Sequence, residues 1–132
     1  MKEELFQLAK RAVACKNWKW LPGMAYTDHA GVIWRVGTNG LMALEGECLP
    51  MLNDSATKGC LLDLLRKAYK DPSMTTHMIK RNKHNVWRVG RLGILPLGKE
   101  YHSELEAMVA ALEKGSQATE IRHHFQQRSS AG

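Results

Sequence analysis

The chain has 132 residues, of which 44% are hydrophobic and 24% are charged. This composition is typical of a soluble globular protein, and the length suits one domain with a core rather than two domains. No apolar run is long enough to cross a bilayer, and the charged N-terminus does not resemble a secretory signal, so we expect a cytoplasmic location.

The charge balance and the cysteines narrow the class further. Nineteen Lys and Arg residues against 13 Asp and Glu residues give a net charge of +6. Such a surplus favours anionic partners: nucleic acid, a nucleotide or an acidic protein face. Cys15, Cys48 and Cys60 are far apart and form no Cys-x-x-Cys pair. We therefore expect small buried residues in a reducing compartment, not a disulfide or a zinc site.

The first segment is predicted to form a helix over residues 2–16, followed by an extended stretch. Apolar residues recur there at helical spacings of three and four, at Leu5, Leu8, Ala12 and Cys15. Trp18 and Trp20 then alternate with Lys19. An extended backbone would place both indoles on one side, and the Pro-Gly pair at residues 22–23 predicts a turn.

The next segment is predicted to form a hairpin. Residues 28–31 indicate a turn, and residues 32–36 are rich in the β-branched and aromatic side chains that favour strands. The Asn-Gly pair within residues 38–40 tolerates the positive φ angles of a tight hairpin turn. The chain would then return as a strand over residues 41–44.

A second helix and a second hairpin are predicted next. Asp54 is the expected N-cap of the helix, because its carboxylate can accept hydrogen bonds from the first backbone N–H groups. The sequence Lys-Asp-Pro at residues 70–72 would end it. Strands are predicted over residues 74–80 and 86–91, on either side of a turn at residues 81–85.

A third helix and a polar tail complete the chain. Ser103, followed three residues later by Glu106, forms a capping box, and Gly115 is the expected end of the helix. The tail, residues 116–132, is expected either to fray or to form a short amphipathic helix. We thus expect a single α+β domain over residues 1–115, in which three helices cover a small antiparallel sheet built from two hairpins.

One short sequence occurs twice: IWRVG at residues 33–37 and VWRVG at residues 86–90. Because side chains alternate along a strand, the Trp and Val of each copy would share one face and the Arg would lie on the other. We interpret the Trp–Val face as core-facing. Arg35 and Arg88 would then be either solvated or directed at one anionic ligand. If the copies belong to a repeated helix–hairpin unit, the two hairpins should superpose and hold similar positions in the sheet.

Two further clusters combine basic and aromatic residues, and both leave two interpretations open. The most basic stretch is the predicted second hairpin, with Lys80, Arg81, Lys83, Arg88 and Arg91. It could grip a phosphate backbone, or its charges could simply protect a sheet edge. Trp18 and Trp20 could stack on bases or belong to the core. With Arg35, these residues are the candidate ligand-binding set.

No pattern in the sequence predicts catalysis or metal binding. The chain has no nucleophile elbow, no P-loop and no dinucleotide-binding motif. Its histidines have no Glu or Cys at ligand spacing. We therefore expect no enzyme activity, no cofactor and no metal.

The chain also resembles a group of small bacteriophage- and prophage-encoded accessory proteins that have no established activity. The resemblance rests on NWKWLPGM at residues 17–24, LPMLNDSATKGCLLDLLRKAYKDP at residues 49–72 and SELEAMVAALEKG at residues 103–115. The middle stretch is the most specific, although Ser55 stands where a proline is expected, and the tail lies outside the resemblance. It implies a phage accessory gene expressed in a bacterial cytoplasm, and it implies no site residue.

Two functions compete on these grounds. In the first, the protein is a non-catalytic binder of an anionic ligand, either a nucleotide signal or nucleic acid, with an anti-defence role as one form. In the second, it is a protein–protein inhibitor that masks a host defence or regulatory component. The first predicts a concave site lined with Arg and Trp, and the second predicts an exposed apolar or charged patch. A structural or packaging accessory would show neither. A homo-oligomer is compatible with both functions, and no membrane partner is expected.

Overall fold

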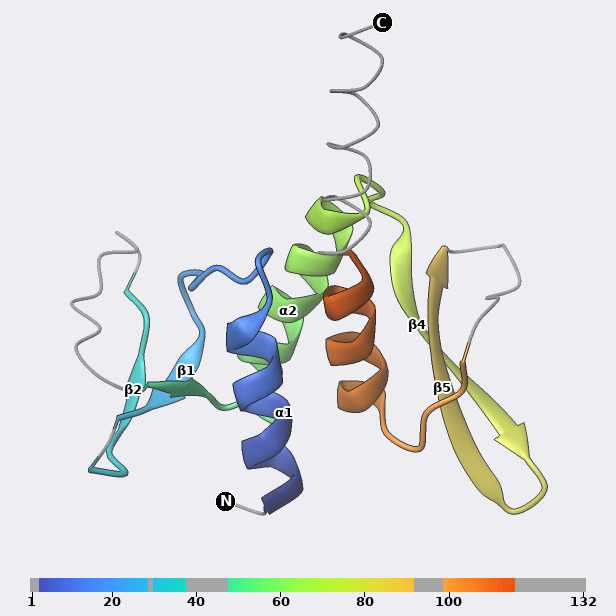
Figure 1. Ribbon diagram of the computed structural model, residues 1–132, viewed down its shortest axis with the longest axis horizontal. Coiled ribbons are helices and arrows are strands. Elements are labelled where there is room, and N and C mark those ends of the chain that lie inside the picture. The colour runs from blue at the N-terminus through green and yellow to red at the C-terminus, as the bar shows by residue number, and fades with distance from the viewer. Residues whose placement is uncertain (1–2, 29, 38–47, 92–98, 116–132) are drawn as a thin grey trace, which may run out of the picture.

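The computed structural model describes residues 3–28, 30–37, 48–91 and 99–115 (Figure 1). Its elements are α1 (Glu3–Ala14), β1 (Ala25–Thr27), β2 (Ile33–Arg35), β3 (Leu49–Pro50), α2 (Ser55–Ala68), β4 (Met74–Arg81), β5 (His84–Arg91) and a last helix described over residues 104–115. The helices form a central layer, with a sheet on either side. The predicted α+β class is confirmed, but the strands divide between two antiparallel sheets, in the orders β2-β1-β3 and β4-β5, where one sheet was expected.

The hydrophobic core lies among the three helices and the side of the first sheet that faces them. Its members are buried and mostly aliphatic: Leu8, Ala9, Ala12, Met24, Val36, Leu52, Leu61, Leu64, Leu65, Met108, Val109 and Leu112. The helical periodicity that predicted α1 therefore also predicted the side that α1 buries. Ala9 and Ala12 are fully buried, and α1 packs against β3.

A hydrogen-bond network ties the first sheet to the start of α2. Asp54 caps the helix as predicted, because its Oδ2 accepts a hydrogen bond from the Thr57 backbone N–H at 3.1 Å. The fully buried Thr57 hydroxyl donates to the same oxygen at 2.9 Å and accepts from the Ala25 N–H at 2.7 Å. At the other end of α2, Lys70 has a φ of 53°, which reverses the chain before Pro72.

The first sheet differs from the predicted hairpin. β2 pairs with the preceding β1, whereas the strand predicted over residues 41–44 lies outside the described residues. The turn at residues 28–31 is confirmed: Asp28 Oδ1 accepts hydrogen bonds from the backbone N–H groups of residues 30 and 32, at 2.9 and 3.0 Å. β3 was not predicted. Its Pro50 has no N–H to donate, and it is tolerated because β3 is an edge strand.

The second hairpin is confirmed, and its strands are longer than predicted. The two strands pair residue for residue from Met74 opposite Arg91 to Arg81 opposite His84. Asn82 has a φ of 57° and forms the turn with its neighbour, so the turn is shorter than the predicted one at residues 81–85. The hairpin rests on the helices through side chains such as Val89, which packs against the core.

The two copies of the repeat are not a repeated structural unit. Each lies in the second strand of a hairpin, but β2 is a three-residue edge strand of one sheet and β5 is an eight-residue strand of the other. The prediction that Trp34 faces the core is wrong, because the residue is 53% exposed. Its indole N–H donates to Asp28 Oδ2 at 2.9 Å, which holds the ring beside the turn. Val36 and Val89 do pack on the core as predicted.

The last helix begins as predicted. Ser103 Oγ accepts a hydrogen bond from the Glu106 backbone N–H at 3.0 Å, as an N-cap does. Gly115 is still helical and lies tight against the end of α2: a Cβ there would lie 3.2 Å from both the Ala68 Cβ and the Tyr69 ring. The predicted tail at residues 116–132 lies outside the described residues, so the domain boundary stays a prediction.

Candidate functional site

The β4–β5 hairpin carries most of the net positive charge. Residues 74–91 contain five of the 19 Lys and Arg residues and none of the 13 Asp and Glu residues. The rest of the chain, with 14 basic and 13 acidic residues, has a net charge of only +1. The hairpin turn projects beyond the helices (Figure 1). The charge is therefore concentrated on an arm that a large anionic partner can reach.

The turn of this hairpin presents its cations to solvent. Lys80, Arg81, Lys83 and His84 are all exposed. Each eight-residue strand extends about 26 Å at about 3.3 Å per residue. Exposed Met78 lies opposite half-buried Trp87, on the same face of the ribbon as Lys80, and adds an apolar contact surface. In general, the major groove of duplex DNA is wide enough to admit a two-stranded ribbon.

One carboxylate oxygen joins two arginines of the hairpin. Glu100 Oε1 accepts hydrogen bonds from Arg81 Nη2 at 2.9 Å and Nε at 3.1 Å, and from Arg88 Nη2 at 2.6 Å. The hydrogen bond from Arg81, helped by that from Arg88, lowers the pKa of Glu100 below its ordinary value. Backbone hydrogen bonds between Trp87 and Tyr101, at 2.7 and 2.9 Å, hold this segment beside β5. The three side chains together keep a net charge of +1.

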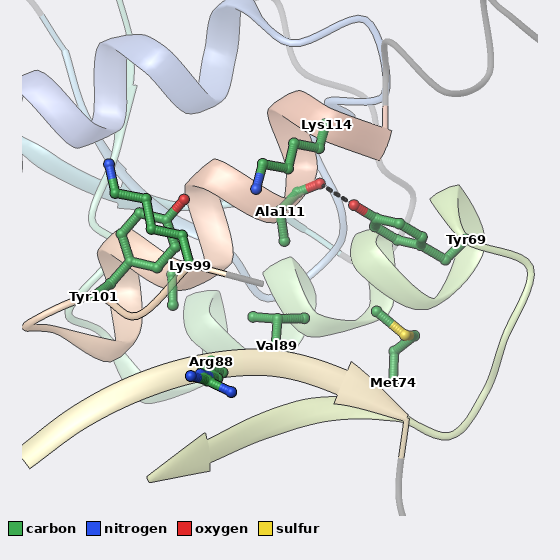
Figure 2. Close-up of a pocket in the computed structure, with 9 residues that line it drawn as sticks. Tyr69, Met74, Arg88, Val89, Lys99, Tyr101, Ala111 and Lys114 are labelled. Carbon is green, nitrogen blue, oxygen red and sulfur yellow. Dashed lines mark hydrogen bonds between the residues drawn. The ribbon is translucent and has the colours of Figure 1, made fainter. Parts of the chain in front are cut away.

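A cleft of about 170 Å³ lies between the hairpin and the last helix (Figure 2). Its lining combines two tyrosines, three cations and apolar side chains: Tyr69, Met74, Arg88, Val89, Lys99, Tyr101, Ala107, Ala111 and Lys114. The Tyr69 hydroxyl donates to the Ala111 carbonyl oxygen at 2.8 Å (dashed in Figure 2), and burial raises the pKa of Tyr69. Lys99 Nζ lies 5.7 Å from the centre of the Tyr101 ring. The cleft is partly open to solvent, and its cations and tyrosines could contact an anionic group such as a phosphate.

Arg35 lies in the first sheet and links β2 to neighbouring segments. Its Nη1 donates to the Gly23 carbonyl oxygen at 2.6 Å and to Asp54 Oδ2 at 3.1 Å, and its Nη2 donates to Asp54 Oδ1 at 3.2 Å. The Arg35 guanidinium, together with Thr57, lowers the pKa of Asp54 to about 2. Arg35 therefore fastens β2 to the first turn of α2, and a helix-capping carboxylate compensates its charge.

Trp18 and Trp20 also lie away from the basic hairpin. Their rings contact each other edge to face, with centroids 5.3 Å apart and an interplanar angle of 89°. Trp20 makes a similar contact with Tyr26 at 5.6 Å, and all three rings pack against the core while remaining partly exposed. This arrangement fits the core interpretation. Base stacking by either tryptophan stays a prediction.

The structure thus brings together part of the candidate ligand-binding set. Lys80, Arg81, Lys83 and Arg88 share the hairpin, and the backbone of Arg91 pairs at its base. Arg35 belongs to β2 of the first sheet, which lies across the helices from the hairpin, so Arg35 and Arg88 do not converge on one ligand. Trp18 and Trp20 are linked to the same sheet through the contact of Trp20 with Tyr26. No local pattern in the sequence indicates Glu100 or the cleft, because both depend on the pairing of Trp87 with Tyr101.

Within the described ranges, no group of three or more His, Cys, Asp or Glu side chains is placed to hold a metal ion. Every helix in that part of the chain is too short or too polar to cross a bilayer. Cys15, Cys48 and Cys60 are free thiols of intermediate burial. Comparison of the chain with protein-family models, curated proteins and solved structures finds no match.

Proposed function

We propose that the protein is a non-catalytic nucleic-acid-binding protein whose β4–β5 hairpin lies along the phosphate backbone. The observation that carries this proposal is that residues 74–91 hold five Lys and Arg residues and no Asp or Glu, in a hairpin whose turn projects beyond the helices. Lys and Arg that neutralise phosphates release condensed counterions, which drives binding without regard to sequence. Among anionic ligands, nucleic acid suits this site better than a nucleotide signal. The described cations are spread from the exposed turn along β5, as suits an extended polyanion better than a single small ligand.

The resemblance to phage accessory proteins supports a setting for this activity. In that setting the protein acts in the cytoplasm of an infected bacterium, on phage or host nucleic acid, and an anti-defence role is one form of it. The proposed mechanism is occupancy: the protein covers or holds the nucleic acid and performs no chemistry on it.

The test is a binding series at several salt concentrations. Fluorescence anisotropy is measured with a labelled 20-base-pair duplex and a 20-nucleotide single strand, and thermal shift is measured with linear and cyclic nucleotides. We expect the oligonucleotides to bind, and the logarithm of the affinity to fall against log salt with a slope of roughly −2 to −4, about 0.9 for each phosphate neutralised. Nucleotides should shift the melting temperature little.

A matched pair of variants locates the binding surface. Lys80→Ala with Lys83→Ala removes two charges from the hairpin turn, and Lys10→Ala with Lys67→Ala removes two exposed charges from α1 and α2. We expect the slope to become shallower by about two units in the first variant only. The proposal fails if no oligonucleotide binds at low salt, or if the two variants weaken binding equally.

A second candidate function is favoured by an exposed apolar segment on the first sheet. Val32, Ile33 and Trp34 are consecutive and 48%, 61% and 53% exposed, at the edge strand β2. A patch of this kind favours a protein partner, as expected of an inhibitor that masks a host component. Wild-type protein would then recover one host protein in stoichiometric amount. Ile33→Asp with Trp34→Asp would lose that protein, and Lys80→Ala with Lys83→Ala would retain it. Retention by the Asp variant would exclude this surface.

A further inference from the structure

The outer face of the hairpin holds an anion site that the chain already occupies with its own carboxylate. Arg81 and Arg88 donate three hydrogen bonds to a single oxygen, Glu100 Oε1. A guanidinium fork fits an oxyanion with two oxygens, and a nucleic-acid phosphate offers separate non-bridging oxygens to two arginines. We propose that Arg81 and Arg88 form a phosphate-binding site in which Glu100 takes the place of the phosphate and is displaced when nucleic acid binds. This inference rests on the proposed function.

The position of the two arginines supports a shared site. Arg81 lies opposite His84 and Arg88 lies opposite His77 in the hairpin register. Residues 77, 81, 84 and 88 therefore all project from one face of the ribbon. The Arg81 side chain is 59% exposed and the Arg88 side chain is 22% exposed. A phosphate can therefore approach from the Arg81 side, while Arg88 forms the inner wall of the site.

The energetics favour exchange of one anion for the other. The Arg81 side of the pair is 59% exposed, and an exposed ion pair adds little to folding stability. An incoming phosphate that takes over the hydrogen bonds to Arg88 would compensate that less exposed arginine for the loss of the carboxylate. Glu100 is ionised at neutral pH, as a glutamate of ordinary pKa is, and the two arginines lower its pKa further. It therefore competes with a phosphate for the two arginines. Lys80 and Lys83 at the turn also attract an incoming polyanion. The affinity of the hairpin for nucleic acid therefore depends on how easily that polyanion displaces Glu100.

The test removes the negative charge of Glu100 and compares the resulting duplex affinity with that of a variant that loses one negative charge elsewhere. Glu100→Gln keeps the shape of the side chain and removes its charge. Glu113→Gln makes the same change in the ion pair between Glu113 and Arg11, 2.6 Å long, which joins α1 to the last helix. With the labelled duplex, we expect Glu100→Gln to bind about three- to tenfold more tightly than wild type, with a salt slope steeper by about one unit. Glu113→Gln should stay within about twofold.

A further variant distinguishes displacement of Glu100 from the arginines from a general increase in the net positive charge of the protein. If Glu100 acts by occupying the two arginines, the double change Arg81→Ala with Arg88→Ala should weaken binding and should also abolish the gain from Glu100→Gln. A full gain that persists in the background without both arginines contradicts the inference. Melting curves of every variant, without nucleic acid, confirm that each one is folded before its affinity is compared.

The outcomes distinguish this inference from the proposed function. Binding by wild type with no larger gain for Glu100→Gln than for Glu113→Gln overturns the phosphate site and leaves nucleic-acid binding in place. Absence of binding by wild type and by both glutamine variants overturns the proposed function itself, and the inference with it.

Discussion

The two segments at residues 33–37 and 86–90 differ only in their first residue, Ile or Val, but they have different surroundings. In β2, all three strand residues are exposed, and the strand pairs over three positions with β1. In β5, the same letters lie inside an eight-residue pairing, with the Trp87–Tyr101 bridge on its other side. The shared sequence therefore specifies a strand in both places. The neighbours on either side decide whether its tryptophan is exposed.

The arginines of the two segments differ in their carboxylate partners. Arg35 binds Asp54, which is fixed as the N-cap of α2 and also accepts two hydrogen bonds from Thr57. Arg88 binds Glu100, which also binds Arg81. Both arginines lie on the β4–β5 hairpin, which has no acidic residue of its own. The first carboxylate belongs to the fold. The second is held by two arginines of the basic hairpin, so its loss should affect binding more than folding.

The largest difference in the free energy of unfolding is expected between the Ala variants of the two tryptophans. Trp87→Ala removes a half-buried indole from the hairpin, and should lower the free energy of unfolding by about 2–3 kcal/mol, somewhat less than for a fully buried ring. Trp34→Ala should cost less than about 1 kcal/mol, because it removes an exposed ring with one hydrogen bond. Urea denaturation of both variants measures the difference. Equal losses would contradict the contrast between the two strands.

The two valines should also differ in the free energy of unfolding that their replacement costs, but here the larger loss is expected in the first segment. Val36 is 4% exposed in the core, so Val36→Ala should cost about 2 kcal/mol for the lost methyl groups and the cavity. Val89 packs on the core but also borders the cleft. Val89→Ala should therefore cost about 1 kcal/mol, because its surroundings are already partly open. A larger loss at Val89 would mean that the hairpin is held to the helices mainly through this residue.

The sequence predicted those features whose signals are local. Caps at Asp54 and Ser103, the helical periodicity of α1 and the turn at Asn82 each depend on residues within a few positions of one another. The exposure of Trp34 depends on Asp28 and on the lack of a strand pairing beyond β2 among the described residues. The Pro50 strand has only two residues, too few for a period-two pattern to show.

Only part of the candidate site was predicted from the sequence. The basic residues of the hairpin are visible in the sequence because they are close together. Their partner Glu100 comes from a segment that reaches β5 through the Trp87–Tyr101 bridge, and no local pattern indicates this pairing. Arg35 was grouped with Arg88 because the two copies look alike. Only the long-range contact with Asp54 separates their roles.

The ion pair of Arg35 gives the first segment a pH dependence that can be measured. The pKa of Asp54 is about 2 in the folded protein, below its ordinary value of 3.8, so its ionised form favours folding. This contribution is complete above about pH 5 and is lost as the pH falls from about 4 towards 2. Arg35→Gln should raise the pKa of Asp54 towards its ordinary value and flatten this part of the stability profile. Asp54→Ala should cost about 1 kcal/mol at pH 7, because it also removes the helix cap. An Arg35→Gln profile that matches wild type would show that the pair does not act in solution.

The smallest expected effect is the change in duplex affinity when either arginine of the repeated sequence is replaced. This change compares the two arginines directly. Arg35→Gln and Arg88→Gln make the same change in charge at the same place in the repeated sequence. On the proposed nucleic-acid binding, Arg88→Gln should weaken the duplex affinity about three- to fivefold and reduce the salt slope by up to one unit. Arg35→Gln should change the affinity by less than about twofold, because its guanidinium is held by Asp54 on the other side of the helices. Anisotropy at two salt concentrations is sufficient to measure both. If the two variants weaken binding equally, binding follows the total charge of the protein and not the hairpin, and the different partners of the two arginines have no consequence for function.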